Sequence, residues 1–453
     1  MKKQKEHSRL FMAVVLTLMC LVYATCMMPA DSYAKTITVK KGSVKVTLEG
    51  TITGNVSKGY YLKMTENVSV KVSGKKYKCK KFKINATKAK LKSLKKFNNK
   101  KVKINATLVA KKKNITLSKV KKITLVEEKV QKLNGTVKAS FSDATVANAI
   151  NCELKYSDDY FSGNASALSD DIQGNIAKLS IVASATMYNQ EFATAFMEKE
   201  LKFSNVKYVT HEASAADPDH SNYMIGYKNI DDYTLVSVWV RGSVGGMNPI
   251  SPDWTSNFNI GEGAVHAGFS KAEEELSNEV TAYITELKNG KLAKDNIKFW
   301  ITGHSRGGAI ANLFGARMTQ AYGKEKVYAD TFASPYVSRV AVSEGFENII
   351  NYVNPGDVVA ALPPAVLQYK RFGKDYAFTD KYAEMSQIYM AKTGMPFVGN
   401  YTKDVVDVIN ASIKSPTDIV TYFAGISNTP EYLKIAQAHA PSLYMSWLEA
   451  IYQ

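Results

Sequence analysis

The sequence predicts two folded parts: a small all-β region, and after it a larger α/β region with a mostly parallel central sheet. Three observations lead to this prediction. Short runs of alternating polar and apolar residues occupy positions 35–126. From residue 223 to 353, apolar strand-length runs alternate with helical stretches, which is the pattern of a sheet with helical crossovers. A chain of 453 residues, 45% of them hydrophobic, has room for two or three domains.

The first 34 residues have the composition of a secretory signal peptide. A basic start is followed by an apolar run over residues 10–28 and by Ser32-Tyr33-Ala34, with small residues at both positions that a signal peptidase reads. We therefore expect residues 1–34 to be removed and the protein to be secreted or held at the cell surface. The apolar run is long for a signal peptide, so an uncleaved membrane anchor is the alternative.

Two cysteines, Cys79 and Cys152, lie outside the signal segment. A secreted protein of this size with two cysteines does not depend on a disulfide framework. We expect two separate thiols, with a bond between them as the alternative.

Positive charge is concentrated in the all-β region. The chain has a formal charge of +18, and residues 35–122 contain 27 lysines and two acids, Glu49 and Glu66. A solvated surface is one interpretation, since the lysines fall on the polar phase of the strands. The other is a face that binds a polyanion, such as a cell-wall polymer or anionic lipid. Nucleic acid is a poor candidate for an exported chain whose strands carry few aromatic residues.

The all-β region, residues 35–126, is expected to be a small closed barrel that resembles an OB-fold. One amphipathic helix, 89–97, precedes the last strands. The expected strands are 44–52, 60–64, 68–72, 81–86, 101–109 and 122–126. A polar passage near 127–135 is the expected linker to the second domain, 127–453.

The second domain is expected to alternate helices and strands. Asp143 is a candidate N-cap for its first helix. The expected helices are 144–152, 175–188, 191–201, 266–287 and 309–321, and the expected strands are 223–227, 234–240, 297–302, 326–331 and 348–353.

The stretch Ile297–Gly308 carries the clearest chemical signal in the chain. Gly303, Ser305 and Gly307 form G-x-S-x-G between a predicted strand and a predicted helix. This context is that of the nucleophile elbow of an α/β-hydrolase, in which a serine projects from a sharp turn above the sheet. We therefore predict that Ser305 is a nucleophile at a helix N-terminus, where the helix dipole favours negative charge.

A serine nucleophile needs a base, and that base needs an acid to hold it. The chain order in α/β-hydrolases is serine, acid, histidine, and His439 is the one histidine after Ser305. Asp357 follows a predicted strand and a Pro-Gly turn, which suits the acid. Asp375 and Asp380 are the alternatives from position alone.

Beyond the elbow, the sequence resembles the class 3 lipases, also called fungal-lipase-like α/β-hydrolases. The resemblance is clear over residues 223–364 and weaker as far as His439. Its motifs, in order, are VWVRGS ending at Ser243, DW from Asp253, VHAGF from Val265, GHSRGGA from Gly303, TFASP from Thr331 and VNPGDVVAALPP from Val353.

The resemblance implies roles for five residues. Ser305 matches the family's nucleophile, Asp357 its acid, and His439 its late histidine by order alone. Ser243 matches the oxyanion-hole residue, and the second donor would be the backbone N–H of Arg306. Family members usually have leucine after the nucleophile, so the Arg306 side chain would either favour anionic substrates or pair with a buried acid.

The resemblance also implies a lid after Ser243. Residues 244–263 are polar with several glycines, and Trp254 could plug the pocket, although an ordinary ordered loop is equally consistent. An extra helical stretch, 404–423, could cap the pocket. The stretch HEASAADPDH from His211 is expected to be a solvated loop, because it lacks recognised metal-ligand spacing. We expect no cofactor and no metal.

The expected function is hydrolysis of carboxylic esters of lipids, such as acylglycerols, through an acyl-enzyme and with contact to a lipid interface. The same triad could serve an acyltransferase or an amidase. A third hypothesis is a cell-surface polyanion-binding protein in which the hydrolase fold is only a scaffold.

Overall fold

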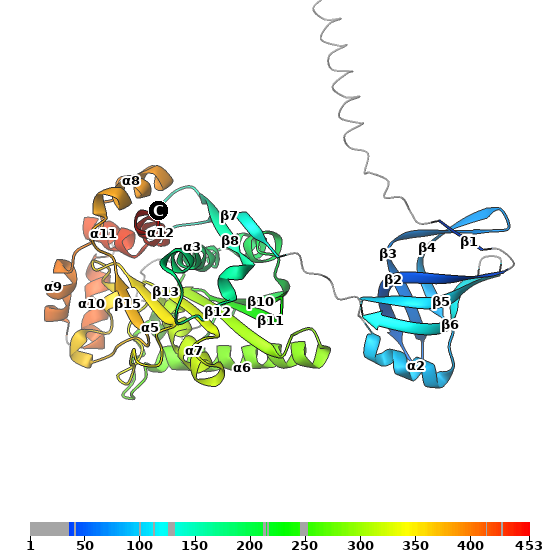
Figure 1. Cartoon of the computed structure of the whole chain (residues 1–453). Helices are drawn as coiled ribbons and strands as arrows, with labels where there is room; N and C mark the ends of the chain where they lie inside the picture. The colour runs from blue at the N-terminus through cyan, green and yellow to red at the C-terminus, as the bar shows by residue number, and fades with distance from the viewer. Residues whose placement is uncertain are drawn as a thin grey trace, which may run out of the picture. The chain divides into compact units, whose positions relative to one another are not determined.

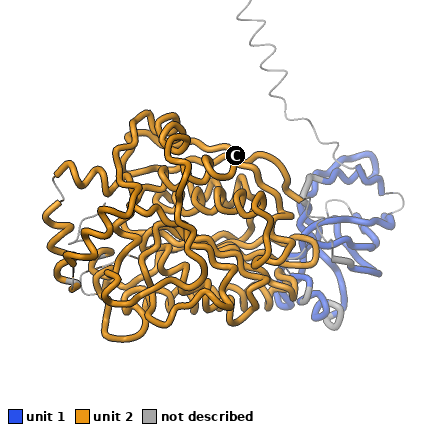
Figure 2. The backbone as a smooth tube through the Cα atoms, turned by 60° about the vertical axis from the view of Figure 1, so that its left-hand side comes forward, with its two compact units in different colours: residues 1–129 blue, residues 130–453 orange. Residues whose placement is uncertain are grey.

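A computed structural model of the chain describes residues 36–39, 42–98, 101–111, 114–125, 132–211, 214, 217–244, 252–413, 415–426 and 429–453. The chain divides into two compact units, Met1–Lys129 and Val130–Gln453 (Figure 2). The predicted signal peptide and most of the predicted linker lie outside the described residues. Within the described part of the chain, no helix is long and apolar enough to cross a bilayer.

The first unit is a ring of strands with one α-helix among its described residues (Figure 1). Neighbouring strands of the ring are antiparallel except for the parallel pair β4–β6. Its strands bond in the order β3-β2-β5-β6-β4, and β4 bonds again to β3, which closes the ring; β1 runs parallel to β3 outside it. The elements are β1 Thr36–Val39, β2 Ser43–Asn55, β3 Gly59–Val72, β4 Lys75–Ile84, α2 Lys88–Leu94, a 3-10 turn Lys95–Phe97, β5 Lys101–Lys111 and β6 Asn114–Leu125.

Alternation along these strands puts apolar side chains inside the ring and lysines outside. Leu62, Val70 and Phe82 are fully buried, while their neighbours in sequence are mostly exposed. The strands expected at 60–64 and 68–72 are one strand, β3. Its pairing with β4 shifts register between Lys63 and Val68, which explains why the apolar pattern breaks there.

The second unit is built on a seven-stranded sheet in the order β15-β14-β13-β12-β11-β10-β9 (Figure 1). The neighbours from β11 to β15 are parallel, and β10 and β9 add antiparallel pairs at one edge. The strands are β9 Ser204–Val209, β10 Tyr223–Ile230, β11 Tyr233–Val240, β12 Asn296–His304, β13 Val327–Phe332, β14 Ile349–Val353 and β15 Lys374–Ala377. The sheet is therefore mostly parallel, as expected.

Helices cover both faces of this sheet, because successive strand side chains point to opposite faces. Trp239 and Trp300 pack with α3 and α12 on one face, whereas Val238 and Ile301 pack with α6 and α7 on the other. The helices are α3 Asp170–Thr186, α4 Gln190–Thr194 with a π-helical turn Ala195–Glu200, α5 Pro252–Phe258, α6 Ala267–Gly290, α7 Arg306–Tyr322, α8 Tyr382–Thr393, α9 Asp404–Ser412, α10 Pro416–Ile426, α11 Pro430–His439 and α12 Pro441–Ile451. Short 3-10 turns span Asp158–Phe161, Val359–Ala361 and Ala365–Leu367.

Two sequence-based helices need correction. The predicted helix 144–152 is wrong, because β7 (Asn134–Phe141) and β8 (Ile150–Ser157) form an antiparallel hairpin. Cys152 and Leu154 of β8 alternate with exposed residues and enter the core, so tertiary burial overrides the local pattern. The predicted helix 404–423 is two helices, α9 and α10, with a proline in the first turn of the second. Cys79 and Cys152 are both free thiols.

Candidate active site

Ser305 lies on a strained turn between β12 and α7. Its backbone angles, φ 59° and ψ −132°, fall in a region that residues other than glycine rarely adopt. A Cβ atom on Gly303 would overlap the carbonyl oxygen of Gly307, and one on Gly307 would overlap the carbonyl oxygen of Val240. The turn therefore requires glycine on both sides of the serine.

Ser305 and Ser243 meet at one end of the sheet. The parallel register sets Val240 of β11 beside Gly303 of β12, so both chains leave the sheet at the same level. Above them lies a pocket with a volume of about 350 Å³. Its lining residues are Ser142, Asp143, Ala144, Thr145, Tyr188, Ser243, Val244, Trp254, His304, Ser305, Tyr432, Ala436, His439, Ala440 and Pro441.

The His439 side chain is held by a buried carboxylate. His439 is the last residue of α11, and its Nδ1 lies 2.9 Å from Oδ2 and 3.1 Å from Oδ1 of Asp357. Asp357 is 1% exposed and also accepts hydrogen bonds from Tyr444 Oη, at 2.8 Å, and from the Val359 amide, at 3.0 Å. These donors hold the carboxylate toward the imidazole, so the second ring nitrogen of His439 remains for the pocket.

The alternative acids of the sequence analysis lie elsewhere. The Asp375 carboxylate pairs with Arg371 Nη1 at 2.6 Å and is nearly half exposed. Asp380 is exposed and accepts a hydrogen bond from its neighbour Thr379. Of the three aspartates considered, Asp357 is the one whose carboxylate lies within hydrogen-bond distance of the His439 ring.

Two residues that the sequence analysis did not select fix the backbone of His439. His304 Nε2–H donates to the His439 carbonyl oxygen at 2.8 Å, and the Tyr188 hydroxyl donates to His304 Nδ1 at 3.0 Å. Burial lowers the pKa of His304 well below its usual value, which keeps the ring neutral with one donor and one acceptor. His304 therefore holds the backbone of His439 in place.

Backbone donors of the type used in an oxyanion hole lie beside Ser305. Arg306 is the first residue of α7, and an N–H at that position has no partner within its helix. On the facing segment, Ser243 Oγ accepts from Asn257 Nδ2 at 3.1 Å, and the Val244 amide donates to Asp253 Oδ2 at 2.9 Å. Both partners belong to α5, so this helix holds the Ser243 segment in place.

The Arg306 side chain does not line the pocket. It is 2% exposed, and its Nη1 donates to the His220 carbonyl oxygen at 2.7 Å while its Nη2 donates to Ser256 Oγ at 3.0 Å. Burial lowers the pKa of the guanidinium. The guanidinium bonds to two neutral oxygens, while the charges of the buried carboxylates of Asp253 and Asp219 act against this lowering of its pKa. It joins the start of α7 to α5.

Residues after β7 form a pocket wall that the sequence analysis missed. Asp143, taken there as a helix N-cap, accepts from Thr145 through Oδ1 and from the Ser442 amide, at 3.1 Å, through Oδ2. It thus caps a tight turn and the start of α12 instead of a helix of its own.

The predicted lid segment is described only in part, since residues 245–251 lie outside the described chain. Its remainder contains α5, and Trp254 on that helix is 3% exposed and lines the pocket. The Trp254 ring lies 5.3 Å from the Phe423 ring of α10 and 5.6 Å from the Phe258 ring. Helix α10 of the extra helical stretch therefore packs against the lid segment.

A mostly parallel sheet with a serine at a strand–helix turn, a later aspartate and a final histidine has the arrangement of an α/β-hydrolase. Residues 237–367 match the family model of lipase (class 3). The part of the chain that contains Ser243, Ser305 and Asp357 is therefore similar to the class 3 lipases, as the resemblance implied.

Individual relatives match part of the chain. A secreted mono- and diacylglycerol lipase from Fusarium solani is 31% identical over 157 residues, which cover 31% of this chain and 43% of the relative. The chain thus spans less than half the length of that relative. Among solved structures, a triacylglyceride lipase from Rhizomucor miehei is 22% identical, with 47% of this chain and 82% of that chain covered and a TM-score of 0.33. Lipase II from Rhizopus niveus is 19% identical, with 54% and 91% covered and a TM-score of 0.34.

Proposed function

We propose that this protein is a secreted serine hydrolase that cleaves carboxylic esters of lipids. The observation that carries the proposal is the joint position of Ser305, on a strained turn, and the Asp357-held imidazole of His439 on the wall of one pocket. The catalytic residues are Ser305, Asp357 and His439, and the oxyanion hole consists of the N–H groups of Ser243 and Arg306.

The reaction follows from these parts. His439 takes the proton of Ser305 as Oγ attacks the ester carbonyl carbon, and the Asp357 carboxylate stabilises the imidazolium. The carbonyl oxygen becomes an oxyanion, which the two N–H groups bind. The C–O bond to the alcohol then breaks, and the alcohol leaves with the proton from His439. Water, activated by the same imidazole, releases the acid and restores the serine.

A lipid substrate suits the pocket and the relatives. Val244, Trp254 and Ala436 contribute apolar surface beside Ser305, which favours an acyl chain. The Fusarium solani relative is named a mono- and diacylglycerol lipase, and we propose acylglycerols as the substrate class. Contact with a lipid interface through the α5 region is part of the same proposal.

Hydrolysis of p-nitrophenyl esters from acetate to palmitate tests the proposal. We expect rates to rise toward long chains, and Ser305→Ala to lower kcat by about 10⁴-fold or more. The matched control is Ser412→Ala, at an exposed serine of α9, which should leave the rate unchanged. Full activity in Ser305→Ala would refute the proposal. Ester products formed with an added alcohol, in place of free acid, would instead identify an acyltransferase.

We also propose that residues 35–126 and 127–453 are separate domains and that the first is an OB-like barrel that binds a polyanion. The five-stranded closed ring with a helix before β5 supports the barrel. Across β3 and β4, Lys63 lies opposite Lys81 and Lys71 lies opposite Lys76, all four exposed. Like charges directly opposite each other destabilise a sheet, so an anionic partner offers a reason for this arrangement.

Binding of the full chain to dextran sulfate and to vesicles containing anionic lipid tests this second proposal. The double variant Lys63→Gln/Lys81→Gln should bind more weakly, lower the slope of affinity against salt, and raise the stability of the barrel. The control is Lys45→Gln with Lys78→Gln, since Thr107 and Ser69 lie opposite these lysines. Retention that does not depend on salt, or equal loss in both double variants, would contradict a specific role for the facing lysines. Tighter binding to dextran sulfate would indicate a wall polymer as the partner, and tighter binding to the vesicles would indicate a membrane.

A further inference from the structure

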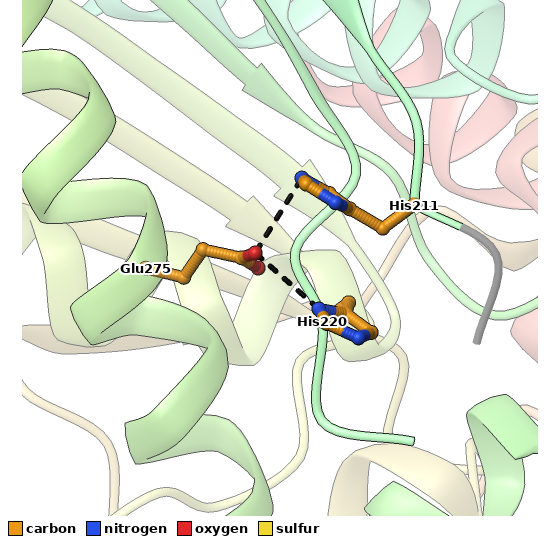
Figure 3. Close-up of side chains that lie close together, drawn as sticks. All are labelled: His211, His220 and Glu275. Atoms are coloured by element: carbon orange, nitrogen blue, oxygen red, sulfur yellow. Dashed lines mark hydrogen bonds and ion pairs between the residues drawn. The ribbon is translucent and has the colours of Figure 1, made fainter. Parts of the chain in front are cut away.

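Two histidines and a glutamate gather outside the pocket (Figure 3). His211 follows β9, His220 precedes β10, and Glu275 lies on α6. Glu275 Oε1 is 3.5 Å from His211 Nε2 and 3.3 Å from His220 Nδ1, and the two imidazole rings stack with centroids 5.1 Å apart. Three potential ligand atoms thus lie within 4.8 Å of one another.

The spacing of these atoms fits a tetrahedral metal ion. Ligands bound at about 2.0–2.1 Å across a tetrahedral angle stand about 3.4 Å apart. Both contacts of Glu275 Oε1 are close to that separation. Because the two rings are stacked, one imidazole has to turn so that both ring nitrogens face the same ion.

Two of the three side chains are oriented by a neighbour that leaves one donor atom available. The second nitrogen of His220, Nε2, lies 3.1 Å from Asp217 Oδ2, which is the carboxylate–histidine pairing common around protein metals. The second oxygen of Glu275, Oε2, accepts from the Ser221 amide at 2.8 Å. His211 Nε2 is buried and has no hydrogen-bond partner among the described residues.

We propose that His211 Nε2, His220 Nδ1 and Glu275 Oε1 bind a Zn²⁺ ion, with water in the fourth position. Two neutral imidazoles and one carboxylate are ligands of the zinc type, whereas Ca²⁺ and Mg²⁺ require oxygen ligands. The three side chains are 24–32% exposed, so an ion can enter from solvent.

The proposed role of the ion is structural: it would hold together segments that lie next to the start of α7. None of the three ligands lines the pocket of Ser305. The carbonyl of His220, however, accepts from Arg306, the residue after the nucleophile. Zinc would therefore fix the β9–β10 connection to α6 and, through His220, hold the first residue of α7.

Titration of metal-free full-length protein with ZnCl₂ in a calorimeter tests the site. We expect one ion per chain and a rise in melting temperature on the order of 5 °C at hundredfold excess over Kd. His220→Gln and Glu275→Gln should each weaken binding by at least about tenfold. The matched control is Glu279→Gln, an exposed carboxylate one turn further along α6, which should bind zinc like the parent protein.

X-ray absorption of the zinc complex gives an independent readout of the ligands, with two imidazoles and one carboxylate expected. Absence of binding, unchanged affinity in both ligand variants, or tighter binding of Ca²⁺ than of Zn²⁺ would overturn the site. Circular dichroism of the metal-free variants separates loss of a ligand from loss of folding. These measurements do not depend on ester hydrolysis, so the zinc site and the proposed function can fail separately.

Discussion

The two units use positive charge in opposite ways. In the second unit, Lys228 and Lys298 are buried, and each ammonium group has defined partners. Lys228 Nζ lies 2.6 Å from Asp158 Oδ1, and Lys298 Nζ donates to the carbonyl oxygens of residues 161–163 at 2.8–2.9 Å. In the first unit, lysines such as Lys45 and Lys71 project from the ring into solvent.

The difference shows which charges determine structure. A buried cation stabilises the fold only in the geometry that satisfies it, so Lys228 and Lys298 specify where the turn at residues 158–163 lies against the sheet. An exposed lysine is solvated in any arrangement of the chain. The charge of the first unit is therefore available for a partner without a large effect on folding.

The largest effect is expected from breaking the buried pair. Lys228→Met leaves the Asp158 carboxylate, which is fully buried, without its cation. Loss of one partner of such a pair costs about 3–5 kcal/mol. Urea unfolding of the second unit measures the change. A cost below about 1 kcal/mol would mean that the pair does not fix this turn.

A smaller loss is expected from Arg306→Leu, which introduces the residue usual in the family. The change removes two hydrogen bonds of a buried guanidinium, to the His220 carbonyl and Ser256 Oγ. Each lost hydrogen bond leaves a buried oxygen without its donor. We therefore expect the free energy of unfolding to fall by about 2–3 kcal/mol and ester hydrolysis to become slower. Arg306→Lys keeps the positive charge but not both hydrogen bonds, so its stability and its hydrolysis rate should lie between those of the parent protein and of Arg306→Leu. Parent-like stability and rate in Arg306→Leu would show that the link between α7 and α5 through the Arg306 side chain is dispensable.

A pH-dependent loss is expected from His266, the N-cap of α6. Its ring is fully buried, its Nδ1 accepts from the Phe269 amide, and burial lowers its pKa to about 4. Because the unfolded value is higher, at about 6.5, the stabilisation is present above pH 6.5 and is lost as the pH falls toward 4. At pH 5 the loss is about 2 kcal/mol. Denaturant unfolding at pH 7 and pH 5 should show a fall in the free energy of unfolding that is smaller in His266→Asn than in the parent protein, by about 2 kcal/mol.

The smallest effect is expected in the first unit. Lys45→Met should change the stability of the barrel by no more than about 0.5 kcal/mol, because the side chain is exposed and lies opposite Thr107. It is the counterpart of Lys228→Met. A large loss would contradict the contrast between the two units.

The parts of the fold that the sequence predicted have strong local signals. The apolar run before Ser305 and the glycines around it define β12 and the turn, and the family motifs point to Asp357. Tyr188 and the 142–145 wall were missed because distant segments bring them to the pocket. His304, next to Ser305 in the sequence, was missed because its role depends on contacts with the distant residues Tyr188 and His439. The helix expected at 144–152 failed because its apolar residues also match the two-residue repeat of a buried strand. The sequence around His211 and His220 did not predict a metal site, because the third proposed ligand, Glu275, comes from the distant helix α6.

The pocket is assembled from both ends of the second unit. Ser142–Thr145 lie near its start and His439–Pro441 near its end, while Ser305 lies between them. During synthesis, the strand that bears the nucleophile leaves the ribosome well before the imidazole that must activate it. If Ser305 and His439 act together as proposed, a nascent chain gains activity only when α11 has been made and packed.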